Sequence, residues 1–186
     1  MLRSQTSQVA EQRLGSSGLQ RLIESMHETM DAVSGVGLAG PQVGIGQALF
    51  VFNLDDRRGH VINPVIETWG QQTHEPPEGC LSVPELYYTP PRLQYAKVTG
   101  VDINGDMVEY AGAGLFARML QHEVDHLHGY LFVDRLEGDQ LRAARRAMVS
   151  TDFVKATQRV NAERSAETSS TFGSGASFGP STSIGH

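Results

Sequence analysis

The sequence contains a single cysteine, a single tryptophan and no long hydrophobic run. Because Cys80 has no second cysteine to pair with, an internal disulfide is excluded, and a lone thiol suits the reducing cytoplasm. The longest apolar runs, such as residues 48–52, are far too short to span a bilayer. A basic start followed by an apolar stretch is also missing. We therefore expect a cytoplasmic protein without a secretory signal or a membrane partner.

The chain is also short of positive charge. It has 15 Lys and Arg residues against 21 Asp and Glu residues, a net charge of −6. A specific nucleic-acid partner is not expected, because phosphate binding requires a basic face. The 186 residues are 39% hydrophobic, which suits one domain that needs no disulfide. Ser, Gly and Thr dominate the end of the chain. We expect a folded domain over residues 1–160 and a flexible tail over residues 161–186.

The first half of the chain predicts one helix followed by strands. Apolar residues at helical spacing predict a helix over residues 17–33. Buried strands are expected over residues 47–54 and 61–66, and an Asn-Pro pair in the second strand marks an edge or a bulge. Residues 67–79 are polar and contain two consecutive prolines, so we expect a loop there.

The second half predicts a hairpin and two helices. Strands are expected over residues 95–103 and 107–110. Asn104-Gly105 predicts a two-residue type I′ turn between them, in which both positions need a positive φ. Helices are expected over residues 114–126 and 139–159.

A His-Glu-x-x-His pattern lies in the first of these helices. His122 and His126 are one turn apart, so both imidazoles face the same side and can bind one cation. Glu123 can act on a water at the metal without being a ligand itself. A chance occurrence on a solvated helix is the alternative, but the apolar flanks favour a buried face, where unpartnered polar groups are costly.

A catalytic divalent ion usually takes a third protein ligand, and Cys80 is the better candidate. Phe132 occupies the position where one known extension of the motif has a third histidine. A thiolate with two imidazoles suits zinc or ferrous iron. Two alternatives stay open for Cys80: a buried small hydrophobe, or a nucleophile with His122 as its base.

Residues 35–44 are rich in glycine, but they do not match a phosphate-binding loop. The stretch lacks the Gly-Lys-[Ser/Thr] ending and follows a helix rather than a strand. Its glycines more plausibly let the backbone approach a ligand closely. Gln42 lies in this stretch and is either an amide donor to an oxyanion or an ordinary polar surface residue.

Three motifs occur in order along the chain. They are Gly-x-Gly-φ-Ala-x-x-Gln at residues 35–42, Glu-Gly-Cys-φ-Ser at residues 78–82 and Gln-His-Glu-x-x-His at residues 121–126. Together they resemble the peptide deformylase family, from about Leu2 to the helix after Leu136. The resemblance implies an α+β domain of antiparallel strands packed around a central metal-binding helix, with a C-terminal helix and a disordered tail. It also implies removal of the formyl group from N-formylmethionyl nascent peptides, with transient ribosome contact.

The resemblance implies a metal centre. Cys80, His122 and His126 would hold one Fe²⁺ ion, for which Zn²⁺, Ni²⁺ or Co²⁺ could substitute. Glu123 would take a proton from the attacking water and return it to the departing amine.

It also implies roles for residues around that centre. The Gln42 amide and the backbone N–H of Leu81 would stabilise the oxyanion. Gly37 and Gly79 would pair with the extended peptide. Arg92 falls where the family has an arginine after the cysteine loop, and it would contact the substrate.

Two departures from the family pattern carry expectations. Gly40 replaces the usual alanine, which predicts a less rigid stretch but no loss of activity. The family normally begins with a strand before a Pro-x-Leu-Arg-like segment, and this chain starts inside that segment at Leu2-Arg3. Either a sheet edge is missing, in which case we expect unpaired edge hydrogen bonds and lower stability, or the true start lies upstream.

Two other functions remain open at this point. A His-Glu-x-x-His endopeptidase would cleave internal peptide bonds and would use a third ligand other than cysteine. A non-catalytic module that is stabilised by metal, or that binds nascent chains, would need no base. The presence of Glu123 and a ligand count of three, which leaves a position open, favour an enzyme.

Overall fold

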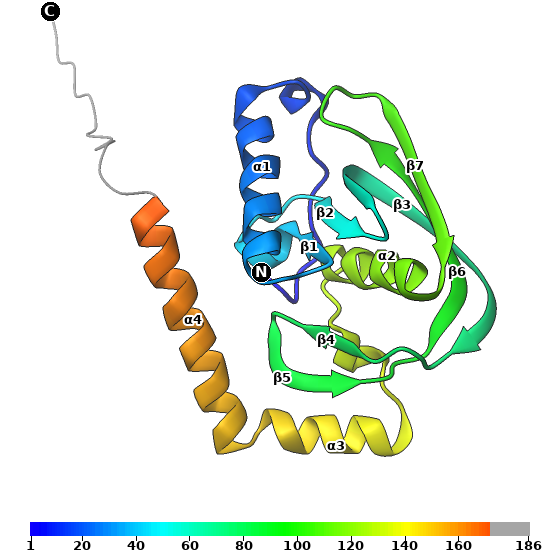
Figure 1. Cartoon of the computed structure of the whole chain (residues 1–186), viewed down its shortest axis with the longest axis vertical. Coiled ribbons are helices and arrows are strands. Elements are labelled where there is room, and N and C mark those ends of the chain that lie inside the picture. The colour runs from blue at the N-terminus through cyan, green and yellow to red at the C-terminus, as the bar shows by residue number, and fades with distance from the viewer. Residues whose placement is uncertain (172–186) are drawn as a thin grey trace, which may run out of the picture.

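The structure is a computed structural model that describes residues 1–171. The larger of its two antiparallel sheets has the strand order β1-β2-β3-β6-β7, and β4 pairs with β5 in a separate hairpin. Figure 1 shows both sheets arranged around one helix, α2, so the expected α+β class is confirmed. The strands are β1 Gly37–Ala39, β2 Leu49–Leu54, β3 Arg57–Thr73, β4 Glu78–Cys80, β5 Val83–Tyr88, β6 Arg92–Val101 and β7 Met107–Ala113. The α-helices are α1 Ser17–Ala32, α2 Gly114–Leu127, α3 Gly138–Met148 and α4 Thr151–Thr171, and the short 3-10 helices are Glu11–Arg13, Gly40–Val43 and Phe132–Arg135.

Strand β3 is longer than expected and replaces much of the loop predicted over residues 67–79. It continues in register with β6 as far as Thr73. The polarity of residues 67–73 suggested a loop, and that prediction was wrong. These residues are largely exposed, and an antiparallel sheet tolerates polar residues where it faces water. Trp69 stacks on Tyr95 across the two strands, with ring centroids 5.6 Å apart. The sequence also does not predict β1, β4 or β5.

Two irregularities bend β3 around α2. The first lies between Ile62 and Val65, as the Asn-Pro pair predicts, and the second follows Trp69. Bulges of this kind kink a strand and increase its twist, and Figure 1 shows β3, β6 and β7 curving past α2. Asn63 at the first bulge also holds the N-terminal segment. Its side chain accepts the N–H of Val9 at 2.8 Å and donates to the carbonyl of Val9 at 3.0 Å.

The hairpin between β6 and β7 is confirmed, but its turn is longer than predicted. Residues 102–106 separate the two strands. Within that loop only Gly105 has a positive φ, +91°, whereas a type I′ turn needs two such residues. The Asp102 carboxylate accepts the N–H groups of Asn104 and Asp106 at 2.8 and 2.9 Å, which stabilises the wider loop.

Helix α2 is enclosed on all sides. The sequence spacing predicts one inward face, but every residue from Phe116 to Leu127 is buried. In Figure 1 the large sheet curves past one side of the helix and the β4–β5 hairpin lies along another. A helix surrounded in this way must find partners for its polar side chains inside the protein.

The single helix predicted over residues 139–159 is two helices. Helix α4 starts after Ser150, whose Oγ accepts the N–H of Phe153 at 3.2 Å. A serine at this position caps a new helix, which explains the break. Because α4 continues past residue 160, the first part of the segment predicted to be a flexible tail is helical. The rest of that tail, residues 172–186, lies outside the described residues.

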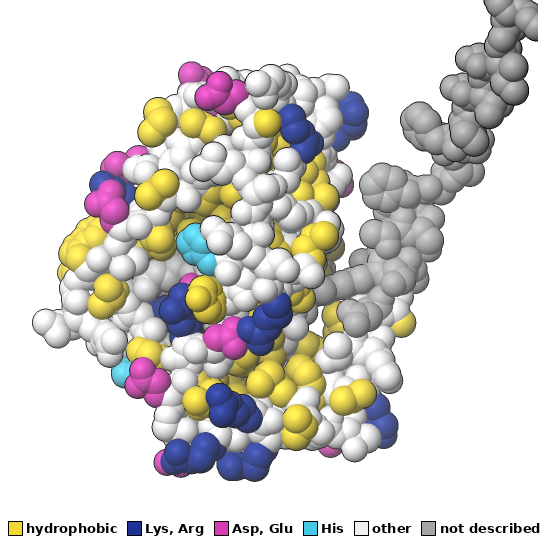
Figure 2. All heavy atoms as spheres, turned by 180° about the vertical axis from the view of Figure 1, so that it is seen from behind, with side chains coloured by type: hydrophobic (Ala, Val, Ile, Leu, Met, Phe, Trp, Pro, Cys, Tyr) yellow, Lys and Arg dark blue, Asp and Glu magenta, His cyan; other side chains and the backbone are white. Residues whose placement is uncertain are grey.

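The exposed side of α3 is basic. Arg142, Arg145 and Arg146 are all exposed. Figure 2 shows Lys and Arg side chains gathered at the end of the molecule where α3 lies. The net charge of −6 is therefore unevenly distributed.

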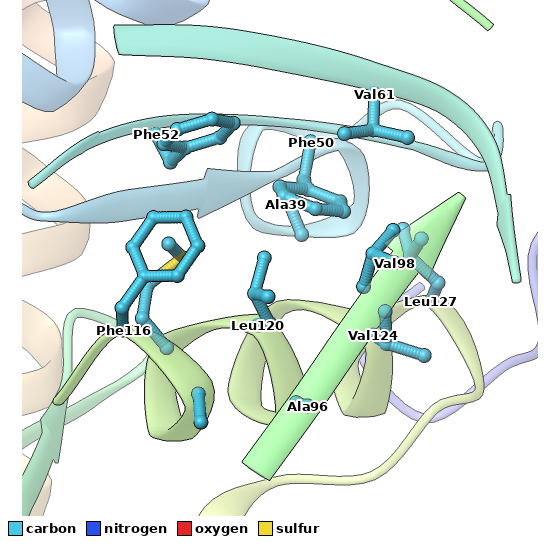
Figure 3. Packing of buried hydrophobic residues seen from close by; sticks show 12 residues of the cluster. Ala39, Phe50, Phe52, Val61, Ala96, Val98, Phe116, Leu120, Val124 and Leu127 are labelled. Carbon is cyan, nitrogen blue, oxygen red and sulfur yellow. The ribbon is translucent and has the colours of Figure 1, made fainter. Parts of the chain in front are cut away.

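The largest hydrophobic cluster lies between α2 and the sheet. Leu120 is fully buried and points from α2 toward Phe50 and Ala39 (Figure 3). Phe52 packs edge-to-face against Phe116, with ring centroids 5.6 Å apart. This packing sets the position of the helix that carries both histidines. None of the helices within residues 1–171 combines the length and the apolar character needed to cross a membrane.

Replacing Leu120 by alanine should lower the free energy of unfolding by about 2–5 kcal/mol, because it leaves a cavity in a closely packed cluster. Urea denaturation followed by circular dichroism measures this loss. Leu115→Ala is a matched control on the same helix, since Leu115 is 42% exposed, and it should cost less than about 1 kcal/mol. Equal losses in the two variants would contradict the observed burial.

His60 in β3 makes stability depend on pH. Its Nε2 accepts the N–H of Ile103 at 3.0 Å, so the folded protein requires a neutral imidazole. Burial lowers the pKa of His60, and the charge of Asp102 opposes this only in part. The unfolded chain therefore binds this proton more readily than the folded protein. The stability that neutral His60 contributes is complete above the unfolded pKa of about 6.5 and is lost as the pH falls below it.

We therefore expect the urea midpoint to fall between about pH 7 and pH 5.5. The fall should be smaller in His60→Gln, which keeps a hydrogen-bond acceptor but does not titrate. Parallel pH curves for the two proteins would show that His60 does not contribute.

Candidate metal centre

Cys80, His122 and His126 bring their side chains to one point. Cys80 ends strand β4, and the two histidines lie one turn apart on α2. The Sγ of Cys80 lies 3.2 Å from the Nε2 of His126, although the two residues are 46 positions apart in the chain. The Nε2 atoms of the two histidines also lie 3.2 Å apart. All three potential ligand atoms lie within 4.8 Å of one another.

This donor set fits a divalent metal ion. Bonds of about 2.1 Å to nitrogen and about 2.3 Å to sulfur place tetrahedral ligand atoms roughly 3.3–3.7 Å apart. The observed spacing of 3.2 Å is close to that range. Three protein ligands also leave one position of a tetrahedral site for water or substrate.

The electrostatics favour the thiolate form of Cys80. Burial raises the pKa of the thiol, but hydrogen bonds with His122 and His126 outweigh burial and hold the pKa well below its usual range. Burial lowers the pKa of His122, while contacts with Cys80 and Glu78 raise it to about 10. The thiolate therefore attracts a positive charge at the place where a metal ion would lie.

Glu78, two residues before Cys80, orients His122. Its Oε2 accepts the Nδ1–H of His122 at 2.9 Å, so the other ring nitrogen faces Cys80 and His126. This is the ring orientation that a metal ligand needs. Burial raises the pKa of Glu78, but hydrogen bonds from Arg92 and His122 lower it to about 2. The carboxylate is therefore ionised near neutral pH.

Three arginines form an ion-pair network that links this carboxylate to Asp125, and Arg92 and Arg118 are its buried members. Arg92 donates to both oxygens of Glu78, at 2.8 and 2.9 Å, and to Asp125 at 2.6 Å. Arg118 donates to Glu78 at 2.9 Å. Arg135 binds Asp125 at 2.6 and 3.1 Å. Because the partners come from β4, β6, α2 and the short 3-10 helix Phe132–Arg135, the network connects the hairpin, the large sheet, the central helix and the segment that follows it.

Glu123 packs against β1 and keeps one carboxylate oxygen unpaired. A Cβ added to Gly37 would lie 2.5 Å from Oε1 of Glu123, so glycine makes room for this side chain. Oε2 is buried and has no hydrogen-bond partner within the described chain, a costly arrangement that points to a function. Burial raises the pKa of Glu123 to about 7, although His122 and His126 act to lower it. A carboxyl group with this pKa can accept and return a proton near neutral pH.

The side-chain amide of Gln42 points toward Cys80. Its Oε1 accepts the N–H of Ala39 at 2.8 Å, and its Nε2 lies 3.7 Å from the Sγ of Cys80. Leu81 follows Cys80 in the chain and lines the same cavity. The two groups predicted to be oxyanion donors therefore lie beside the candidate metal ligands.

These groups line a cavity of about 430 Å³. Gly37 of β1 and Gly79 of β4 contribute backbone to it, and Leu115 and Met119 of α2 contribute apolar side chains. The predicted peptide-binding glycines are therefore both at the cavity.

Arg92 is not where the sequence prediction places it. The residue is 5% exposed, its guanidinium is enclosed by Glu78 and Asp125, and within the described chain it is not among the residues that line the cavity. Motif spacing locates an arginine after the cysteine loop, but it does not show which way the side chain points. The predicted substrate contact is replaced by a contact with Glu78.

Gly40 lies in a closely packed part of the chain. A Cβ added there would lie 2.9 Å from the carbonyl oxygens of Ile45 and Gln47. The absence of a methyl group therefore lets the short 3-10 helix lie close to the following loop. The lower rigidity expected from the sequence stays a prediction.

The sequence pattern does not reveal the roles of Glu78, Arg118 and Asp125. Glu78 begins the Glu-Gly-Cys motif and Asp125 lies inside the histidine motif, while Arg118 interrupts the apolar residues of the predicted helix. Charged side chains in a buried helix require partners, so the sequence indicates that some network of internal ion pairs exists. The sequence does not indicate which charged residues pair with one another, because several of the partners come from strands that are distant in the chain.

Comparisons with known proteins agree with this site. The chain matches the model of the polypeptide deformylase family over residues 1–142. The peptide deformylase of Mycobacterium marinum (strain ATCC BAA-535 / M) is 50% identical over 144 residues, which are 71% of this chain and 73% of the relative. That of Rhodococcus opacus (strain B4) is 48% identical over 144 residues, 70% of this chain and 74% of the relative. The chain belongs to the polypeptide deformylase family.

Solved deformylase structures share the fold. The peptide deformylase from Thermus thermophilus has a TM-score of 0.75 at 38% identity, covering 86% of this chain and 93% of that one. The peptide deformylase from Synechococcus elongatus, solved in complex with actinonin, has a TM-score of 0.72 at 36% identity, covering 82% and 85%. Deformylases are metal-dependent enzymes that remove the formyl group from nascent peptides, and this chain is such an enzyme. Membership in this family argues against both the endopeptidase and the non-catalytic alternative.

Replacing Glu78 by glutamine should weaken metal binding about 10- to 100-fold, because a neutral amide holds the His122 ring less firmly than a carboxylate. Titration with Zn²⁺ against a competing chelator measures the affinity. Glu75→Gln, on an exposed residue of the preceding loop, is the matched control and should bind metal normally. A lower melting temperature with unchanged metal affinity would show that Glu78 acts on stability alone.

Proposed function

We propose that Cys80, His122 and His126 hold the metal ion of this deformylase and that Glu123 moves the protons. The observation that carries the proposal is the unpaired, buried Oε2 of Glu123 beside three converging ligand atoms. A purely structural metal site has no use for such a carboxylate. When bound, the ion supplies a Lewis acid that polarises the formyl carbonyl.

Glu123 performs both proton transfers in this proposal. Its carboxylate takes a proton from the water that attacks the formyl carbon. As the C–N bond breaks, the same carboxyl group gives that proton to the departing amine nitrogen. The products are formate and a peptide with a free amino terminus. The pKa of about 7 suits both directions of transfer.

Gln42 and Leu81 stabilise the oxygen of the formyl group as it gains negative charge. The bond from Ala39 to Oε1 of Gln42 leaves the amide NH₂ as the donor on the cavity side. The backbone N–H of Leu81 is the second donor, because it follows the ligand Cys80 directly. Losing one donor of this kind typically costs about 10²–10³ in rate.

The peptide binds as an added strand between β1 and β4. Within the described chain β1 is an edge strand that pairs with β2 alone, and β4 pairs with β5 alone. Gly37 and Gly79 lie on these two strands and line the cavity. An extended peptide gains main-chain hydrogen bonds by pairing with such edges. A deformylase from Acinetobacter baumannii, 36% identical with a TM-score of 0.68, is bound to the peptide Met-Ala-Ser.

Apolar side chains from α2 suit the methionine of that peptide. Leu115 and Met119 line the cavity about two turns and one turn before His122, respectively. A methionine side chain packs well against such a surface, since its flexible thioether adapts to irregular apolar walls.

Arg92 acts as a positioning residue in place of a substrate contact. It holds the Glu78 carboxylate, which in turn holds the His122 ring. Its contribution to the reaction therefore passes through the metal ligand.

The ion we propose is Fe²⁺, which the family resemblance suggests. One thiolate and two imidazoles are also suitable ligands for zinc, nickel or cobalt, so availability decides among them.

The cytoplasm is the place of action that we propose, because a lone thiolate ligand survives best in a reducing compartment. Transient contact with the ribosome also stays a proposal. The exposed arginines of α3 form a basic patch that suits RNA phosphates (Figure 2).

Glu123→Gln should retain the metal and lower formate release from formyl-Met-Ala by about 10²–10⁴-fold, because the glutamine amide cannot accept the proton. Protein purified without oxygen is assayed for formate and for metal content by elemental analysis. Unchanged turnover in this variant would overturn the proposed base.

Cys80→Ala should lose most of its metal and with it the activity, because two imidazoles alone bind a catalytic ion weakly. Ser82→Ala, two residues further along, is a control that should keep both the metal and the activity. A Cys80→Ala protein with full metal content would show that the third ligand lies elsewhere, as an endopeptidase site would require.

A further inference from the structure

One wall of the catalytic cavity comes from a helix outside the family match. The family model covers residues 1–142, whereas α4 begins at Thr151. Val160 of α4 nevertheless lines the cavity that holds Cys80 and Glu123. The catalytic groups therefore belong to the part of the chain that the family model matches, while this part of the cavity wall lies outside it.

Apolar packing and one ion pair hold α4 beside strand β5. Phe153 of α4 and Leu86 of β5 both pack against the hydrophobic cluster that contains Val83. Ala156, one turn later, is 4% exposed. Arg159 forms an ion pair with Glu85. The positions 153, 156 and 160 follow helical spacing, so they form one stripe on α4. The stripe that anchors the helix thus carries Val160 to the cavity.

Val160 lies some distance along the hairpin from the metal ligands. Cys80 pairs with Val83 across the hairpin, and the ion pair of Arg159 is with Glu85, two residues further along β5. The hairpin is irregular at this point, because Cys80 pairs with Val83 whereas the preceding residue, Gly79, pairs with Tyr87, and Glu85 has a φ of +63°. Glu85 and Val160 both line the cavity, so a peptide that extends from the reaction centre by about 3.4 Å per residue reaches this part of the wall with a residue downstream of its first methionine.

We propose that α4 forms part of the peptide-binding surface and that Val160 contacts the third residue of the substrate, favouring an apolar side chain there. The proposal rests on the proposed function, since it takes the reaction centre to lie at Cys80 and Glu123. It adds a determinant of peptide preference downstream of the first methionine.

The test compares peptides that differ in their third residue. For the full-length protein loaded with metal, the ratio of kcat/KM for formyl-Met-Ala-Leu to that for formyl-Met-Ala should fall about 3- to 10-fold in Val160→Asp, because one half-buried apolar contact is lost. The same variant should gain relative activity on formyl-Met-Ala-Lys, since the new carboxylate attracts the lysine. Val154→Asp is the matched control. Val154 is a 46% exposed valine of the same helix that is not among the cavity residues, so the ratio should not change.

A binding measurement makes the test independent of turnover. Calorimetry of Met-Ala-Leu and Met-Ala with the metal-loaded protein should show tighter binding of the tripeptide, and Val160→Asp should reduce that advantage. Should the charged variant fail to fold, Val160→Thr keeps the shape of the side chain and should reduce the same advantage by a smaller factor. Tripeptide preference that is equal in wild type, Val160→Asp and Val154→Asp would overturn the proposal. Absence of formate release from the wild-type protein on formyl-Met-Ala would overturn the proposed function instead, and the calorimetry would still decide the role of Val160.

Discussion

The Glu78 carboxylate accepts hydrogen bonds from His122, Arg92 and Arg118, and the geometry of the metal centre depends on it. An ionised carboxylate in the interior is tolerated only when its charge is paired and its oxygens are hydrogen-bonded. Its partners come from β6 and α2, so the hairpin, the sheet and the helix satisfy this charge in one arrangement. Cys80 lies two residues after Glu78 on β4, and the same arrangement places its thiol beside both histidines.

Helix α2 shows how such a site is supported. The helix is enclosed on all sides, and its apolar residues pack against the curved sheet. Most of its polar side chains have partners within the protein. Among the exceptions in the described chain, Oε2 of Glu123 and Nδ1 of His126 lie at the metal centre. Unpaired polar atoms lower stability, and the hydrophobic cluster around Leu120 offsets that cost, so a reactive carboxylate can be held in a buried place.

The chemistry and the proposed recognition of the third substrate residue reside in different parts of the chain. The candidate ligand atoms and Glu123 lie on β4 and α2, inside the stretch that matches the family. Helix α4 lies beyond that stretch and borders the same cavity through Val160. A fold can keep one reaction while elements added at its periphery change which substrates fit, because function resides in sites carried on a scaffold.

Features with a local physical cause were readable from the amino-acid order. The spacing of His122 and His126 places both rings on one side of a helix whatever surrounds it, and the Asn-Pro pair disturbs a strand wherever that strand lies. Features that depend on distant partners were not readable. Residues 67–73 are polar and are a strand only because β6 pairs with them. The direction of the Arg92 side chain is set by Glu78 and Asp125, since a buried guanidinium must reach the nearest carboxylates, and those come together only in the folded chain.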